Sequence, residues 1–164
     1  MIGSEIYSNP VQHVRIKIPE DQCPKDDKGR VKFGATPWHQ DLGVVTEEAD
    51  DSDMLTVWFP LMDTDEKNGC LTVVPGSHKE PMTHFKKRDW QICDTDVSGE
   101  NDTMVPLDPG GCLFFHGLMH HGTPANFSQD QRRALQFHYR PACATTITTE
   151  ARLEIFGSEG KDVE

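Results

Sequence analysis

Hydrophobic and polar residues alternate along several short stretches of the chain, a period of two that is typical of strands with one buried face. β-Branched and aromatic residues are frequent in these stretches, and no run of ten or more residues has a clear helical period. The predicted strands lie at residues 11–18, 54–62, 70–76, 111–119 and 133–141. The pattern predicts an all-β protein.

The segments between the predicted strands are rich in glycine, proline, asparagine and aspartate, which favour turns. In "VVPGSH", Pro75 and Gly76 suit the central positions of a type II turn, because proline fixes its own φ and glycine accepts a positive φ. Pro109 and Gly110 predict a similar turn in "LDPGG". Many short strands joined by tight turns favour a sandwich or a barrel.

The chain has 164 residues, a length typical of one domain with one core. No internal repeat, low-complexity tract or linker divides it. We expect residues 1–155 to form the domain and residues 156–164 to form a polar tail. Any active site must then lie within this single β domain.

The balance of charges excludes some classes of partner. Lysine and arginine number 16 against 27 aspartates and glutamates, so the formal net charge is −11. Such a chain repels phosphate backbones and anionic membrane surfaces at long range. No signal peptide is recognisable, and no segment approaches the ~18 consecutive apolar residues that span a bilayer. We expect a soluble, cytoplasmic protein with no nucleic-acid or membrane partner. The five cysteines form no CxxC pair, and we expect reduced, mostly buried thiols.

The stretch "ATPWHQDLGVV" contains the pattern His-x-Asp at His39 and Asp41. In an extended strand these two side chains point to the same side, while Gln40 points away. One imidazole nitrogen and one carboxylate oxygen could then reach a common metal ion. Alone the pattern is weak, because His-x-Asp often occurs by chance at a polar strand edge.

A second histidine would complete the facial triad of non-haem Fe(II) oxygenases, which leaves three coordination positions open. The stretch "HGLMHHGTPAN" supplies three candidates, His116, His120 and His121. An antiparallel barrel could lay this segment beside the His39 strand. Alternation places His120 and His121 on opposite faces, so at most one of them points inward.

Three blocks, "PWHQDLG", "TVWFPLMDTDEKNGCLTVVPGSHK" and "LDPGGCLFFHGLMHHGTPANFSQDQRRALQFHY", resemble in order and spacing the phytanoyl-CoA dioxygenase family of Fe(II)- and 2-oxoglutarate-dependent oxygenases. Together they cover residues 36 to about 139. The resemblance implies a double-stranded β-helix, the jelly roll also found in cupins. It also implies few or no helices here, because the helical region that usually precedes these strands is short or absent.

The resemblance implies a role for individual residues. His39, Asp41 and His121 match the metal ligands, and His121 is chosen because it directly precedes Gly-Thr. Arg132 matches the arginine that binds the far carboxylate of 2-oxoglutarate, a role that suits its planar, permanently charged fork. Thr123 and Trp58 match two further residues of the family's 2-oxoglutarate site.

The implied reaction consumes 2-oxoglutarate and O₂, releases succinate and CO₂, and hydroxylates an unactivated C–H bond of a small organic substrate. The presence of Asp41 favours hydroxylation over halogenation, because related halogenases have a small residue there. Two alternatives remain: a non-catalytic jelly-roll binding module or enzyme fragment, and a cupin enzyme of another kind. A short N-terminal region would expose an apolar sheet face, which favours homo-oligomers or a site completed by another subunit.

Overall fold

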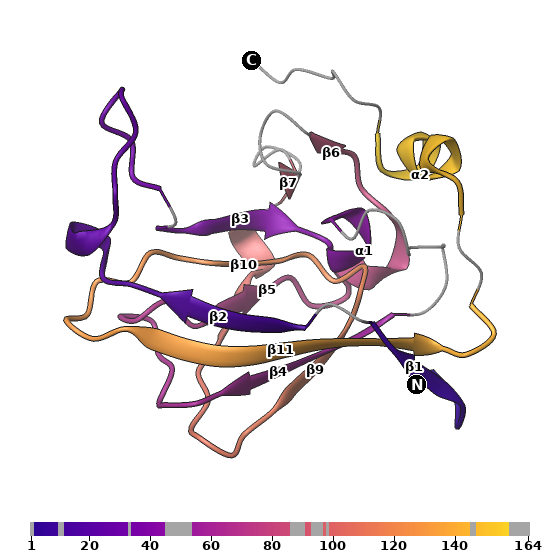
Figure 1. Cartoon of the computed structure of the whole chain (residues 1–164), viewed down its shortest axis with the longest axis horizontal. Coiled ribbons are helices and arrows are strands. Elements are labelled where there is room, and N and C mark those ends of the chain that lie inside the picture. Colours follow the sequence, from indigo (N-terminus) through magenta and orange to yellow (C-terminus); the bar gives the residue numbers. More distant parts are fainter. Residues whose placement is uncertain are drawn as a thin grey trace.

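Two antiparallel sheets face each other and form the body of the chain. The computed structural model describes residues 2–9, 12–32, 34–44, 54–85, 91–92, 97, 99–144 and 147–157. The larger sheet has the order β1-β11-β4-β9, with β2 also paired to β11; the smaller has the order β3-β10-β5-β8. In Figure 1 the larger sheet runs across the lower half of the molecule and β3, β10 and β5 lie above it.

The larger sheet is organised around β11 (Arg132–Pro141), its longest strand. On one edge β11 pairs with β2 (His13–Lys17) and, further along, with β1 (Ile6–Ser8). On the other edge it pairs with β4 (Leu55–Pro60), which in turn pairs with β9 (Leu113–His116). Alternation along β11 is clear, since Arg132, Ala134, Gln136 and His138 are all buried.

The smaller sheet contains short strands only. They are β3 (Thr36–His39), β10 (His121–Thr123), β5 (Leu71–Val73) and β8 (Thr103–Val105). A separate two-stranded ribbon joins β6 (His84–Phe85) and β7 (Gln91–Ile92). Short 3₁₀ turns occur at Glu20–Gln22, Ser77–Lys79 and Gly99–Asn101.

The predicted all-β jelly roll with few helices is confirmed. Within the described residues the α-helices are α1 (Asp41–Val44) and α2 (Thr149–Phe156). Each predicted strand has a counterpart, although the observed ends differ by a few residues, as is usual for element boundaries. The predicted turns are confirmed as well: the Ser77 amide donates to the Val74 carbonyl and the Gly111 amide to that of Asp108, with φ of 84° at Gly76 and 90° at Gly110.

The structure corrects one local prediction. Asp41 does not continue the strand of His39, because β3 ends at His39 and Asp41 is the first residue of α1. The amides of Gly43 and Val44 both donate to the Gln40 carbonyl and close a tight helical turn. His39 and Asp41 still point to the same side, but the turn rather than strand alternation places them there.

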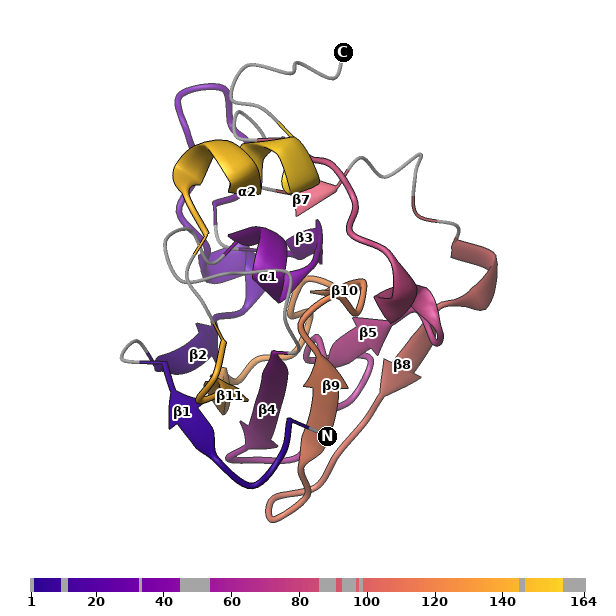
Figure 2. The same ribbon diagram turned by 90° about the vertical axis from the view of Figure 1, so that its right-hand side faces the viewer.

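Helix α2 packs against α1 and was not predicted from the sequence. Thr148 caps it, since the Thr148 hydroxyl accepts a hydrogen bond from the Ala151 amide at 3.2 Å. Phe156 is 1% exposed and packs with Leu42 and Met54. Figure 2 shows α2 lying above α1. The expected polar tail thus begins with a buried residue, and residues 158–164 lie outside the described residues, so the rest of that expectation stays a prediction.

The outer face of the larger sheet exposes large apolar side chains. Val14 is 64%, Ile16 55% and Phe114 62% exposed. These three residues give the outer face of the sheet an apolar character, while a homo-oligomer remains a prediction. Cys23 and Cys70 are buried free thiols as expected, whereas the free thiol of Cys143 is exposed.

No helix within the described part of the chain is long and apolar enough to cross a membrane.

The packing of α2 can be tested by truncating its last side chain. Phe156→Ala should lower the free energy of unfolding by about 3–5 kcal/mol, because it leaves a cavity between Leu42 and Met54. Denaturant unfolding followed by circular dichroism measures this. Phe127→Ala is the matched control, since Phe127 is 62% exposed. Equal effects of the two substitutions would show that α2 does not pack on this core.

Candidate metal centre

Two histidines meet across neighbouring strands of the smaller sheet. Antiparallel pairing of β3 with β10 sets His39 directly opposite His121, and their ring centroids are 4.1 Å apart. Asp41 lies beside both rings, and its Oδ1 is 3.5 Å from Nε2 of His39 and 3.5 Å from Nε2 of His121. One ligand atom from each residue lies within 4.8 Å of the other two. The three side chains could therefore hold one metal ion.

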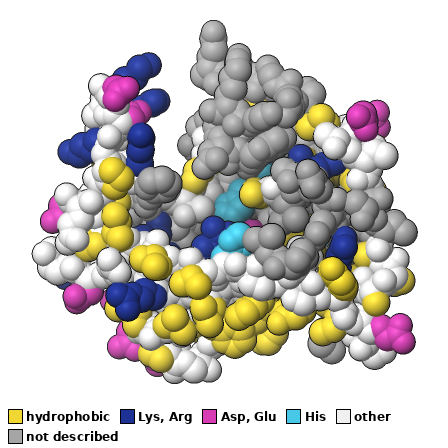
Figure 3. All heavy atoms as spheres, viewed as in Figure 1, with side chains coloured by type: hydrophobic (Ala, Val, Ile, Leu, Met, Phe, Trp, Pro, Cys, Tyr) yellow, Lys and Arg dark blue, Asp and Glu magenta, His cyan; other side chains and the backbone are white. Residues whose placement is uncertain are grey.

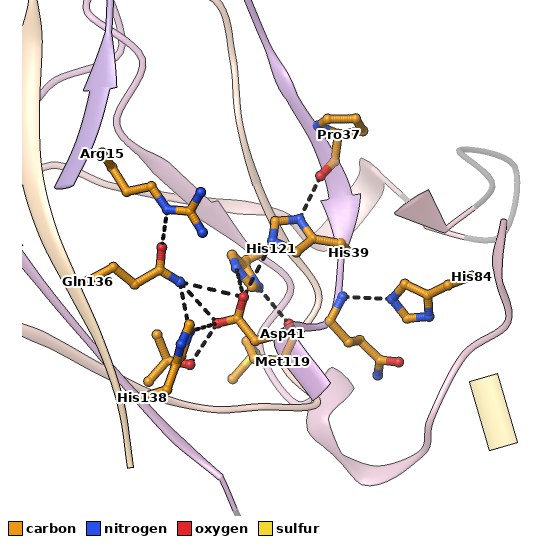
Figure 4. Close-up of polar contacts among 11 residues, drawn as sticks. Arg15, Pro37, His39, Asp41, His84, Met119, His121, Gln136 and His138 are labelled. Carbon is orange, nitrogen blue, oxygen red and sulfur yellow. Dashed lines mark hydrogen bonds and ion pairs between the residues drawn. The ribbon is translucent and has the colours of Figure 1, made fainter. Parts of the chain in front are cut away.

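Each imidazole is oriented by a backbone carbonyl two residues earlier. Nδ1 of His39 donates to the Pro37 carbonyl at 2.8 Å, and Nδ1 of His121 donates to the Met119 carbonyl at 2.9 Å. With the proton on Nδ1, the lone pair of each neutral ring is on Nε2, the atom facing Asp41 (Figure 4). A hydrogen bond from the ring nitrogen that does not bind the metal is the usual way in which proteins fix the orientation of a metal-binding histidine.

The second oxygen of Asp41 is held by residues of the larger sheet. Oδ2 accepts hydrogen bonds from Oγ1 of Thr56 at 2.6 Å and from Nε2 of Gln136 at 3.3 Å, and Nε2 of His138 lies 3.3 Å away. Oδ1 faces the two histidines, and its contact with Nε2 of Gln136 is longer, at 3.5 Å. Asp41 is thus arranged to bind a metal through one oxygen.

The buried carboxyl of Asp41 is stabilised in its charged form. Burial alone would raise the pKa of Asp41. When the ring of His121 is protonated, its charge attracts the carboxylate, and together with hydrogen bonds from ring N–H groups of His121, His138 and His39 it lowers the pKa of Asp41 well below its ordinary value. Burial and the neighbouring His39 lower the pKa of His121. A carboxylate beside a neutral imidazole is the state that binds a divalent metal.

Gln40 lies between the two candidate ligands in the sequence and points away from them. Its hydrogen bonds hold the turn between β3 and α1 in place. Its side-chain amide donates to the carbonyls of Glu80 and Leu118 at 2.9 and 2.8 Å, and its Oε1 accepts from the Met82 amide at 2.7 Å. The Gln40 backbone amide donates to Nε2 of His84 at 3.0 Å. These bonds link the turn that carries Asp41 to residues 80–84 and to Leu118, which lies three residues before His121.

His84 packs so closely on the turn that residue 43 must be glycine. A Cβ atom at Gly43 would lie 2.3 Å from the His84 ring. Burial lowers the pKa of His84 to about 4, so the ring stays neutral and its Nε2 can accept the Gln40 amide. The other face of the turn contacts α2, where Arg152 donates to the Gly43 carbonyl.

A cavity of about 440 Å³ opens beside the three candidate ligands, and both histidines line it. Trp58, Thr123 and Arg132 line the same cavity, so the structure brings the predicted co-substrate residues together with His39 and His121. Arg132 is 3% exposed, and its Cζ lies 5.5 Å from the centre of the Trp58 ring. In Figure 3 histidine and basic side chains lie side by side in a hollow near the centre of the face.

Arg132 and Thr123 have unused hydrogen-bonding atoms. Nε and Nη1 of Arg132 and Oγ1 of Thr123 are buried without a partner within the described structure. Burial lowers the pKa of Arg132 to about 10, so the guanidinium is still charged at neutral pH. Buried donors without partners are costly, and a bound anion would satisfy them.

The geometry favours His121 over the two other candidate histidines. Only His121 joins His39 and Asp41 among the described residues that could hold a metal. Nδ1 of His116 accepts the Leu118 amide at 3.0 Å, and the backbone amide of His120 donates to Ser77. Lys86, Lys87 and Arg88, the only basic run in the sequence, lie outside the described residues.

Thr56, Gln136 and His138 were not expected at the site from the sequence. The alternation of inward and outward residues along β11 could have indicated Gln136 and His138, because both share the inward face with Arg132. Thr56 gave no comparable signal, since a buried threonine in a strand is ordinary. The roles of all the candidate site residues remain predictions that the geometry favours.

An antiparallel jelly roll with two histidines and a carboxylate at its mouth defines a class, the non-haem iron oxygenases and their cupin-like relatives. Residues 25–134 match the signature of the family described as Phytanoyl-CoA dioxygenase (PhyH). The chain belongs to this family.

Three related proteins show how far the similarity extends. Peroxisomal phytanoyl-CoA dioxygenase of Bos taurus is 32% identical over 133 residues, which is 76% of this chain and 39% of the relative. The 1-deoxypentalenic acid 11-beta-hydroxylase of Streptomyces arenae is 29% identical over 120 residues, or 65% of this chain and 41% of the relative. The chain spans about two fifths of the length of these two relatives. The third related protein is a solved structure.

That solved structure matches nearly the whole chain. The epimerase SnoN, in complex with Fe³⁺, alpha ketoglutarate and nogalamycin RO, aligns with a TM-score of 0.67 and 25% identity over 98% of this chain and 60% of SnoN.

The hydrogen bond between Thr56 and Asp41 gives a test of the metal centre. Thr56→Val keeps the shape of the side chain but removes the donor to Oδ2, and we expect metal affinity to fall by about 10–100-fold. Anaerobic titration of the metal-free protein with Fe(II) measures the change. Thr72→Val is the control, because Thr72 is also a buried strand residue but does not bond to Asp41. Equal affinities in the two variants would contradict this role for Thr56.

Proposed function

We propose that the chain is an Fe(II)- and 2-oxoglutarate-dependent oxygenase that hydroxylates a C–H bond of a small organic substrate. The observation that carries the proposal is the convergence of His39, Asp41 and His121 at one end of a cavity that also contains the unpartnered, buried guanidinium nitrogens of Arg132 within the described structure. The jelly roll and the family signature support it.

The donor set fits a ferrous ion. Two neutral imidazoles and one carboxylate are the ligands of the facial triad of Fe(II) oxygenases, and they leave adjacent positions for further ligands. When bound, iron and 2-oxoglutarate supply, with O₂, the oxidising power to functionalise a C–H bond, and succinate and CO₂ are released.

The chain's own residues bind and orient the reactants. Arg132 would bind the far carboxylate of 2-oxoglutarate with its fork, and the Thr123 hydroxyl would donate to the same group. Trp58 packs beside Arg132 and excludes water from that end of the cavity. Thr56 and Gln136 hold Asp41 in place, so little reorganisation is needed when the reactants bind.

The presence of a carboxylate at position 41 affects which reaction we expect. With iron bound, the carboxylate of Asp41 would take the coordination position that a halide needs, so we expect hydroxylation rather than halogenation. The similarity to SnoN supports a second outcome, inversion of a stereocentre at the same residues. Product analysis by mass spectrometry separates the two, because hydroxylation adds the mass of one oxygen atom and epimerisation leaves the mass unchanged.

The test of the proposed function is succinate formation from 2-oxoglutarate by the iron-loaded chain. We expect turnover that requires Fe(II) and increases with a suitable substrate from a panel of acyl-CoA thioesters, amino-acid derivatives and small natural products. His39→Ala and Asp41→Ala should abolish turnover and leave the circular dichroism spectrum unchanged. Full activity in either variant would disprove the assignment. A protein that takes up no iron under anaerobic loading would instead be a non-catalytic binding module.

The anchoring role of Arg132 has its own prediction. Arg132→Met should weaken 2-oxoglutarate binding by about 10–100-fold, because a hydrogen bond to a charged group contributes about 1.5–3 kcal/mol. Calorimetric titration of the manganese-loaded protein with 2-oxoglutarate measures the affinity. Arg133→Met is the matched control, since Arg133 is the next residue of β11 and is exposed. A loss in Arg133→Met as large as in Arg132→Met would refute the role.

A further inference from the structure

A second arginine lies at the mouth of the cavity that contains the candidate ligands. On β2 (His13–Lys17) Arg15 is exposed, as are its neighbours Val14 and Ile16, whereas Lys17 is buried. Arg15 lines the cavity together with His39, His121 and Arg132. Its neighbour in register on β11 is Ala134, a small buried residue between Arg132 and Gln136. The pairing of β2 with β11 therefore sets Arg15 between the Arg132 end of the cavity and the Asp41 end.

Within the described residues, most of the guanidinium of Arg15 is unused. Nε donates to Oε1 of Gln136 at 2.6 Å, and no described carboxylate forms an ion pair with Arg15. In Figure 4 the two terminal nitrogens point toward the side of His121 and His39. Packing around the side chain lowers the pKa of Arg15, and the charge of Asp41 opposes that shift. The free part of the fork can bind an oxyanion.

The cavity has more positive charge than is needed to balance the negative charge of 2-oxoglutarate. The described side chains that line it include three cations, Arg15, Lys17 and Arg132, and no aspartate or glutamate, in a chain of net charge −11. A ferrous ion with Asp41 carries one positive charge and Arg132 a second, which together balance the two negative charges of 2-oxoglutarate. Arg15 and Lys17 then remain uncompensated.

Lys17 is less available than Arg15. Its ammonium group donates to the Gly34 carbonyl, and the side chain is 4% exposed. Burial and the neighbouring Arg132 lower the pKa of Lys17 to about 8. Of the two remaining cations, Arg15 is therefore the one with free donors and with access from solvent.

We propose that Arg15 forms a subsite for an oxyanion group of the substrate, so that the substrate is an organic acid, a carboxylate or a phosphate ester, with an apolar body. This inference rests on the proposed function and adds the substrate class. The apolar body would pack against Leu71 and Phe115, which line the same cavity. Gln136 joins Arg15 to Asp41, so the bound anion would sit one hydrogen-bonded side chain away from a metal ligand.

The test compares probes that share a six-carbon body and differ in the charged or neutral head group. The manganese-loaded protein, saturated with 2-oxoglutarate, is titrated by calorimetry with hexanoate, hexyl phosphate and the neutral hexanamide. We expect at least one anion to bind about tenfold or more tightly than the amide, because its hydrogen bonds to the guanidinium are charge-assisted. The anion that binds better identifies carboxylate or phosphate as the recognised group.

Arg15→Gln should abolish the preference for the anion, while Arg133→Gln should retain it. Arg15→Gln should also leave the affinity for 2-oxoglutarate unchanged. The proposal is overturned if hexanamide binds as well as both anions, if neither anion binds, or if Arg15→Gln keeps the preference. It is also overturned if Arg15→Gln weakens 2-oxoglutarate, since Arg15 would then belong to the co-substrate site. Failure of the proposed function looks different, because the unmodified protein would then bind no metal or no 2-oxoglutarate.

Discussion

The arrangement of the site depends on one buried carboxylate. Asp41 is 3% exposed, and burying a lone charge is costly unless it is paired and hydrogen-bonded. Its two oxygens face different sheets. Oδ2 accepts from Thr56 and Gln136 of the larger sheet, whereas Oδ1 faces the histidines of the smaller sheet and has one longer contact, 3.5 Å, with Nε2 of Gln136. The carboxylate thus joins the two sheets at the mouth of the jelly roll, where a divalent ion would compensate its charge.

The turn that carries Asp41 is held from the opposite side by segments distant in sequence. Gln40 fastens it to the carbonyls of Glu80 and Leu118, and His84 accepts the Gln40 amide. The ring of His84 in turn contacts Phe156 of α2, with centroids 5.7 Å apart. The C-terminal helix is therefore part of the support of the candidate metal centre, through packing rather than through any ligand.

Part of the site could be predicted from the sequence. His39 and Asp41 form a short-range pattern two residues apart, whereas His121 and Arg132 were matched through the resemblance to the family. The supports could not be predicted in the same way. The contact between Thr56 and Asp41 depends on how β4 is placed by its pairing with β11, and α2 gave no helical period because its eight residues bury Arg152 as well as Phe156. Such contacts follow from tertiary packing, which local patterns do not encode.

We propose one metal ion at His39, Asp41 and His121, with 2-oxoglutarate extending from it to Arg132. A crystal structure of the chain grown anaerobically with Fe(II) and 2-oxoglutarate tests this most directly. We expect iron bound to Nε2 of both histidines and to Oδ1 of Asp41 alone, with the far carboxylate on the fork of Arg132. Iron bound to His120 in place of His121, or a dicarboxylate that does not reach Arg132, would contradict it.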